Sequence, residues 1–275
     1  MAARRAWANP AVRTFPSSFR PRTASISVVA LSAETIPWQQ QVGARLKAYA
    51  GFKSIAMCSL MAGFFACYFL LLKFPVFSVT EMPVTALDRW IVFQPAALPL
   101  YLSLWVYISL APGLLDRKDE LLAYYLAMIG LAGVGLAVFF FWPTAVPPSG
   151  IDWLQHPATA QLKGSDGAGN ACPSLHVAFA VFTALQLHRL LRQVGARGWV
   201  RLLNAGWCLG ILYSTLATKQ HVALDVFAGS ALGLAGVFLA SRFPMGQHLG
   251  PRADPALKII ECEKWEIRKN PTHSP

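Results

Sequence analysis

The chain has 275 residues, of which 55% are hydrophobic and only 13% are charged, and its mean hydropathy is +0.44. This composition excludes an ordinary soluble domain and is typical of a multi-span membrane protein. The formal net charge of +11 would also suit a nucleic-acid-binding protein. The basic residues, however, are distributed as membrane topology requires, so we expect no nucleic-acid partner.

Both ends of the chain are polar. Residues 1–50 are basic, and their first acidic residue is Glu34. The apolar patch Ile26–Leu31 is too short for the core of a signal peptide. We therefore predict a flexible basic cytoplasmic N-terminal tail over residues 1–50. The polar, proline-containing segment 244–275 is predicted to be a cytoplasmic C-terminal tail.

Residues 51–243 contain six hydrophobic runs, each close to the roughly 20 residues that span a bilayer. Backbone that faces lipid must satisfy its hydrogen bonds internally, so each run is predicted to be a helix. The fourth run is the least hydrophobic, but its neighbours require a span there. The sequence thus predicts an all-α fold, a polytopic membrane protein with a six-helix transmembrane bundle. The runs are Ser54–Leu72, Phe93–Ala111, Leu121–Trp142, Ser174–Leu191, Trp199–Ala217 and Val222–Phe243.

The basic residues set the predicted orientation of the bundle. With both tails and the second and fourth loops in the cytoplasm, four of the 24 Lys and Arg fall on the outer side: Lys73, Arg89, Lys163 and Lys219. We expect an integral protein of the plasma (inner) membrane with both termini cytoplasmic. Gly229-x-x-x-Gly233 predicts close helix contacts inside one bundle rather than dimerisation, and the oligomeric state stays open.

The first motif is Cys172-Pro173-Ser174-Leu175-His176, at the start of the fourth run. Pro173 suits the first turn of a helix, where its missing N–H costs nothing. Ser174 and His176 would then lie at a helix N-terminus whose free N–H groups attract anions, phosphate above all. Ser174 adds a hydroxyl, and His176 can give or take a proton.

The second motif, His221-x-x-x-Asp225, opens the sixth run. Residues four apart share a helix face, so the carboxylate can hold one imidazole nitrogen and leave the other as a nucleophile. Lys219 is predicted to contact a phosphate oxygen, and Thr215 offers a hydroxyl nearby. Ionisable side chains at membrane depth are costly, which makes both motifs candidates for one functional site at the outer face.

These residues suit phosphoryl transfer, which needs in-line attack and charge stabilisation on the equatorial oxygens. A nucleophilic His221 and an acid His176 meet that need, so we predict no metal and no other cofactor. Histidines on two helices could instead bind haem in an electron-transfer protein, or two histidines and one aspartate could bind iron. A serine protease is disfavoured because Ser174 and His176 are two residues apart on a helix. A non-catalytic lipid scaffold or scramblase stays open.

Pro173-Ser174-Leu175-His176 and Thr218-Lys219-Gln220-His221-x-x-x-Asp225 resemble two signatures of the type 2 phosphatidic acid phosphatase superfamily. Leu175, where glycine is more common, and the lead-in Asp166-x-x-x-Asn170 are similar to its inositol phosphorylceramide synthase-like branch. The resemblance covers roughly Phe139 to Gly236. It implies a phosphohistidine on His221 oriented by Asp225, His176 as acid and then base, and Ser174 as a phosphate ligand.

The chain departs from the family pattern at the phosphate clamp. Thr215 stands where an arginine is common, and Lys219 is the expected substitute. The signature lysine and Arg-Pro after the third span are absent, because Trp142–Pro147 contains no base, and Lys163 is the candidate replacement. Val222 stands where this branch would have an aromatic residue.

The function predicted from the sequence is that of an integral membrane lipid-phosphate phosphatase, with a lipid phosphate in the bilayer as substrate and a phosphohistidine intermediate at the outer face. The alternative within the superfamily is a phosphotransferase that moves a phospholipid head group to an alcohol such as inositol. The motif residues are the same for both reactions. The alternative of another class is a haem-binding electron-transfer protein.

Overall fold

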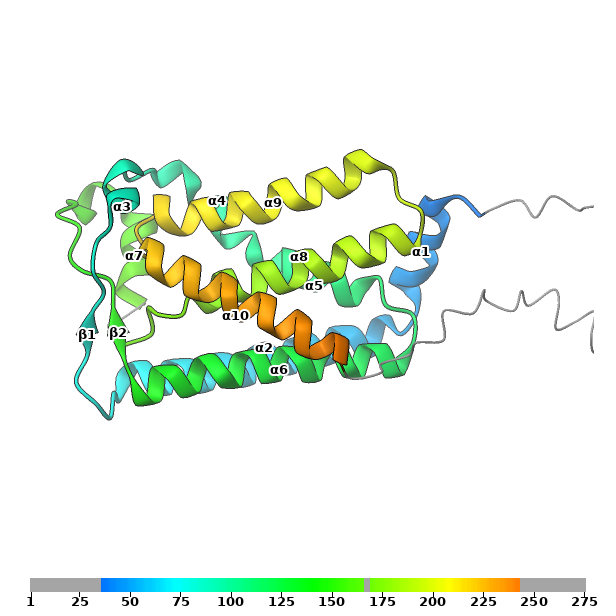
Figure 1. The fold of residues 1–275 in the computed structure, drawn as a ribbon, viewed down its shortest axis with the longest axis horizontal. Helices are drawn as coiled ribbons and strands as arrows, with labels where there is room; N and C mark the ends of the chain where they lie inside the picture. Colours follow the sequence, from blue (N-terminus) through cyan, green and yellow to red (C-terminus); the bar gives the residue numbers. More distant parts are fainter. Residues whose placement is uncertain (1–35, 166–168, 243–275) are drawn as a thin grey trace, which may run out of the picture. The chain divides into compact units, whose positions relative to one another are not determined.

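The computed structural model describes residues 36–165 and 169–242. Most of the predicted N-terminal tail, all of the predicted C-terminal tail and the lead-in residue Asp166 lie outside these ranges. The described chain is dominated by long helices that run side by side (Figure 1), and two of the segments that join them carry short strands and helices of their own.

Each predicted run coincides with helix, so the all-α membrane fold is confirmed. The long helices form six rods, one for each predicted run. Five rods are continuous, and the second is broken at Ser103. The Ser103 hydroxyl donates to the carbonyl of Leu100 and competes there with the helical hydrogen bonds. The rods are α2 (Ala50–Lys73), η1 (Pro95–Ala97) with α4 (Leu98–Leu102) and α5 (Leu104–Gly113), α6 (Lys118–Phe141), α8 (Leu175–Gln193), α9 (Gly198–Ala217) and α10 (Ala223–Arg242).

Four described segments are long and apolar enough to cross a membrane: α2, Pro95–Gly113, α6 and Ala223–Ser241. The helices α8 and α9 are less hydrophobic, and a total of six spans stays a prediction. The position of α8 explains its composition, since it packs against α5, α6, α9 and α10 (Figure 1). A helix enclosed by other helices needs little apolar surface toward lipid.

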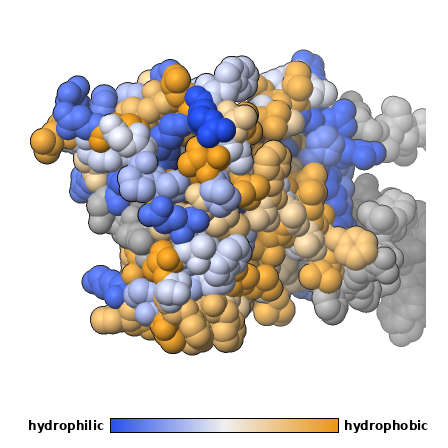
Figure 2. All heavy atoms as spheres, turned by 60° about the vertical axis from the view of Figure 1, so that its left-hand side comes forward, coloured by the Kyte–Doolittle hydropathy of each residue, from blue (hydrophilic) through white to orange (hydrophobic). Residues whose placement is uncertain are grey.

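The two ends of the bundle differ. One end carries the short parallel pair β1 (Thr80–Glu81) and β2 (Thr144–Ala145), with α3 (Ala86–Trp90), η2 (Trp153–Gln155) and α7 (Pro157–Ser165). The helix α1 (Trp38–Lys47) and the last residues of α10 lie at the other end (Figure 1). On the face drawn in Figure 2, hydrophilic residues gather toward both ends and mostly apolar residues lie between them.

The compact unit that holds the bundle begins at Ile36, and helix α1 lies inside the segment 1–50 that the sequence predicts to be a tail. Trp38 and Val42 of α1 pack against the hydrophobic core. The Lys53 ammonium donates to the carbonyls of Arg45 and Gly113, at 2.7 and 2.8 Å, where α1 and α5 end. A cation is favourable at helix C-termini, so this contact fixes α1 to the bundle.

Small residues let α10 approach α8 closely, as predicted for Gly229 and Gly233. A Cβ on Gly229 would meet the carbonyl of Ser174, and one on Gly233 would lie 2.7 Å from the Ala178 carbonyl oxygen. The backbones of the two helices therefore touch along this line. This contact brings the start of α10 beside the start of α8.

Candidate active site

The two sequence motifs meet where α8 and α10 begin. The backbone N–H of Ser174 donates to the carbonyl of Asp225 at 3.1 Å, which joins the motifs directly. Ser174 is the N-cap of α8, and its hydroxyl oxygen accepts from the N–H of Val177 at 3.3 Å. Pro173 therefore precedes the helix rather than starting it, because serine is the better capping residue.

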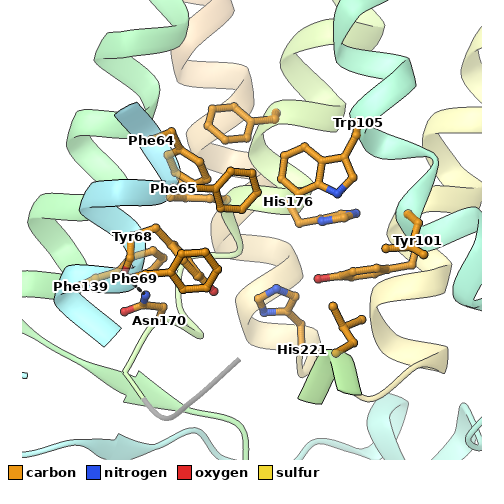
Figure 3. A pocket seen from close by; sticks show the side chains of 14 residues that line it. Phe64, Phe65, Tyr68, Phe69, Tyr101, Trp105, Phe139, Asn170, His176 and His221 are labelled. Atoms are coloured by element: carbon orange, nitrogen blue, oxygen red, sulfur yellow. Dashed lines mark hydrogen bonds between the residues drawn. The ribbon is translucent and has the colours of Figure 1, made fainter. Parts of the chain in front are cut away.

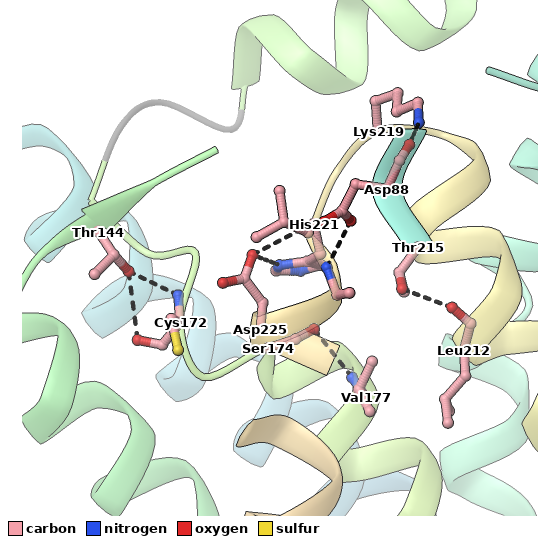
Figure 4. Close-up of polar contacts among 12 residues, drawn as sticks. Asp88, Thr144, Cys172, Ser174, Val177, Leu212, Thr215, Lys219, His221 and Asp225 are labelled. Carbon is pink, nitrogen blue, oxygen red and sulfur yellow. Dashed lines mark hydrogen bonds and ion pairs between the residues drawn. The ribbon is translucent and has the colours of Figure 1, made fainter. Parts of the chain in front are cut away.

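The His221 ring faces Asp225, as predicted, but His221 lies two residues before α10 instead of opening that helix. The Nδ1 of His221 lies 3.4 Å from Oδ2 of Asp225, which is ion-pair distance but long for a hydrogen bond. The same carboxylate oxygen accepts from the N–H of Val222 at 2.9 Å (Figure 4). Asp225 is fully buried and His221 is 8% exposed. Because Nδ1 faces the carboxylate, Nε2 is the nitrogen left for a reaction.

His176 lies in an aromatic setting one residue inside α8. Its ring stacks on Tyr101 with centroids 4.0 Å apart and an angle of 13° between the planes. The indole of Trp105 meets the same imidazole edge-on, with centroids 6.1 Å apart. Tyr101 and Trp105 are one turn apart on the broken second rod, which therefore fixes the plane of the His176 ring.

His176 and His221 line one pocket, with about 690 Å³ of empty space that is partly open to solvent (Figure 3). The rest of its lining is mainly aromatic and comes largely from α2 and the second rod. The described lining residues include no Lys and no Arg. The pocket thus combines two imidazoles with apolar walls that suit a lipid chain. These walls include Phe64, Phe65, Tyr68, Phe69, Tyr101, Trp105, Phe139 and Phe179.

Three of the four residues predicted to bind a phosphate make other contacts: Lys219, Thr215 and Lys163. The Lys219 ammonium donates to the carbonyls of Asp88, at 2.9 Å, and of Ile91. Thr215 is fully buried, and its hydroxyl donates to the Leu212 carbonyl at 2.8 Å. The Lys163 ammonium donates to the Lys219 carbonyl at 3.2 Å. None of the three lines the pocket.

A family model described as the PAP2 superfamily matches residues 84–239, which is more than half of the chain. The chain belongs to the PAP2 superfamily. No curated protein and no solved structure matches it. Membership gives this protein a phosphatase- or phosphotransferase-type function, and its apolar helices and lipid-phosphatase family indicate a lipid substrate in the membrane. The inositol phosphorylceramide synthase-like branch stays a prediction.

Asp88 of this PAP2 superfamily protein is a site residue that our sequence analysis missed. Its Oδ1 accepts from the N–H of Ala223 at 2.7 Å (Figure 4). Its Oδ2 accepts from the N–H and the hydroxyl of Thr85, each at 2.7 Å. It therefore caps both its own short helix α3 and the start of α10. The sequence signal was Thr85-x-x-Asp88, the spacing of a capping box.

Lys219 completes this connection between α3 and the turn that joins α9 to α10. It lies just after the end of α9 at Ala217, its backbone is left-handed with φ of 56°, and its side chain turns toward α3. Burial lowers the pKa of Lys219 below its ordinary value, and the nearby Asp88 acts in the opposite direction. The lysine and Asp88 together position His221, which lies two residues further along the chain.

The segment that lacks the family's first-signature base has a structural role in this protein. The hydroxyl of Thr144 in β2 accepts from the N–H of Cys172 at 2.7 Å, and Thr144 pairs with Asn170 in an isolated bridge. The Asn170 side chain donates to the carbonyl of Tyr68 at 3.2 Å. These contacts hold the loop that enters α8, and hence the first motif, against α2.

Proposed function

We propose that this protein is a lipid-phosphate phosphatase that works through a phosphohistidine on His221. The observation that carries the proposal is the shared pocket of His176 and His221, with Asp225 behind the second ring. A nucleophile held by a carboxylate and a separate proton donor are the two groups that in-line transfer from an alkyl ester requires.

In the first step, Nε2 of His221 attacks phosphorus while the bond from phosphorus to the lipid oxygen breaks. A protonated His176 gives its proton to the departing alkoxide. In the second step, the now neutral His176 takes a proton from water, whose oxygen attacks phosphorus and releases His221. Asp225 stabilises the positive charge that the His221 ring carries in the phosphohistidine intermediate between the two steps.

Head-group transfer is the second candidate, and the charge of the pocket favours it. A phosphomonoester carries close to two negative charges at pH 7, whereas a phosphodiester carries one. The described lining offers no Lys or Arg, and the Lys219 ammonium contacts main-chain carbonyls instead. A site with so little positive charge suits a phosphodiester donor and an alcohol acceptor in place of water.

Sidedness belongs to the proposal as well. We place the end that carries α3, α7 and both histidines on the outer side of the plasma (inner) membrane, because the basic-residue rule puts the two tails in the cytoplasm. A lipid in the outer leaflet would then reach the pocket along the apolar rings of α2.

The test is turnover by purified protein on a panel of lipid phosphates and phospholipids, with and without an alcohol such as inositol. Phosphate release reports hydrolysis, and a new phosphodiester reports transfer. His221→Ala should abolish turnover and the acid-labile phosphoprotein. His176→Ala should lower turnover about 10²- to 10⁴-fold on alkyl esters and much less on nitrophenyl esters, whose leaving group needs no proton.

The matched control is His188→Ala, on the same helix as His176 but exposed and outside the pocket. It should leave turnover within about twofold of the unmodified protein, as exposed substitutions generally do. Small and equal effects of His176→Ala and His221→Ala would contradict the proposal.

A further inference from the structure

Tyr101 stands out because it meets one histidine of the pocket and points at the other. Its ring lies flat on His176, with centroids 4.0 Å apart. Figure 3 shows its hydroxyl directed into the pocket, toward His221. Tyr101 itself is buried, with 7% of its surface exposed. The hydroxyl group thus borders the part of the pocket that lies between the two imidazoles.

The pocket requires a hydrogen-bond donor at that place. Phosphoryl transfer spreads negative charge over equatorial oxygens that a protein usually stabilises with cations. Among the described lining residues there is no Lys or Arg, and Lys163 and Lys219 each donate to a backbone carbonyl. The segment after the third span, Trp142–Pro147, contains no base either. The stabilising groups in this pocket must therefore be largely neutral donors.

We propose that the Tyr101 hydroxyl donates a hydrogen bond to a non-bridging oxygen of the phosphoryl group during its transfer to and from His221. This role rests on the proposed function. The phenol keeps its proton throughout, so the bonds that form and break are those between phosphorus, His221 and the lipid or acceptor oxygen. A hydrogen bond to an anion is stronger than one between neutral groups, and more so in an apolar pocket.

The ring of Tyr101 has a separate, positioning role. Its flat contact with His176 and the edge-on contact of Trp105 hold the imidazole in one plane. The hydroxyl and the ring can be removed separately, because Tyr101→Phe deletes only the donor while Tyr101→Leu deletes both. The two variants therefore distinguish hydrogen bonding to the phosphoryl group from alignment of the acid.

Tyr101→Phe should lower kcat/KM about 100-fold, the usual effect of losing one donor to a developing oxyanion. The inhibition constant of orthovanadate, which mimics the five-coordinate phosphoryl group, should rise by a similar factor. Tyr101→Leu should lose further activity, most of all on lipids with poor leaving groups that need His176. Tyr125→Phe is the control, since its hydroxyl donates to the Lys53 carbonyl at 3.1 Å, outside this pocket.

The deciding measurement is the rate of phosphohistidine formation in a single turnover. This rate is normalised to the number of sites that become labelled, so that misfolded protein does not contribute to it. If Tyr101→Phe stays within about twofold of the unmodified protein in this rate, the donor role is overturned. A slower rate with unchanged vanadate inhibition would also overturn it, because a transition-state contact must affect both. Absence of phosphohistidine in the unmodified protein would instead contradict the function proposed for His221.

Discussion

At the scale of single residues, the carboxylates at the start of α10 have distinct tasks. Asp225 faces His221, whereas Asp88 reaches the same helix end from α3 and accepts the first N–H of α10, that of Ala223. Negative charge at a helix N-terminus is favourable, and both groups supply it. The position of His221 therefore depends on contacts from Asp225 and Asp88, which are 137 positions apart in the chain.

Asp88→Asn should destabilise the protein and lower its activity. The amide replaces one accepting oxygen by a donor, which leaves at least one buried N–H or hydroxyl without an acceptor, at a cost of about 2–4 kcal/mol. The midpoint of thermal unfolding in detergent should fall by at least about 5 °C. Turnover should fall with KM little changed, because His221 loses its alignment while the pocket walls stay.

The control for this change is Asp152→Asn, an exposed carboxylate that caps the short helix η2. It should shift the midpoint by no more than about 1 °C, since exposed residues contribute little. Equal shifts from both variants would show that Asp88 does not hold α10.

At the scale of elements, the line of contact between α8 and α10 decides whether a site exists. Gly229 faces the carbonyl of Ser174, the N-cap of α8. Gly229→Ala should push the two helix starts apart, because backbone cannot yield as a flexible side chain can. We expect a lower unfolding midpoint and at least about a tenfold loss of turnover, measured on the same preparation.

The matched control for Gly229→Ala is Gly133→Ala on α6, because nothing lies within 4 Å of a Cβ at Gly133. Alanine is the better helix former by about 1 kcal/mol, so this variant should be as stable as the unmodified protein or slightly more so. Normal activity in Gly229→Ala would mean that the approach of α10 to α8 is not needed for the site.

At the scale of the whole molecule, the two ends of the bundle predict a sidedness that labelling can test. The test uses two variants, each with a single cysteine in a protein whose native cysteines have been replaced. Ser149→Cys lies in an exposed loop at the end of the bundle that holds His176 and His221, and Lys118→Cys lies at the start of α6, at the opposite end. A membrane-impermeant maleimide should label Ser149→Cys on intact cells and Lys118→Cys only after permeabilisation. The opposite pattern would place the site in the cytoplasm.

Much of this arrangement could be predicted from local patterns. Long apolar runs fix the helices, since lipid-facing backbone has few alternatives. The four-residue spacing of His221 and Asp225 predicts that the two side chains lie close together, and the structure shows them 3.4 Å apart, although His221 precedes α10, which begins at Ala223. The phosphate clamp could not be predicted in this way. The direction of the Lys219 side chain depends on the carbonyls of Asp88 in α3 and of Ile91 just after it, which lie more than 120 residues away in the chain.

The amino-acid sequence alone determined the helices, the family and the two histidine motifs, because hydrophobic length and short spacings act within one element. Only the tertiary structure decided what surrounds the histidines. Tyr101 and Trp105 reach His176 from the second rod, and Asp88 reaches the start of α10 from α3. Such contacts between distant segments depend on how helices pack, which no local pattern encodes.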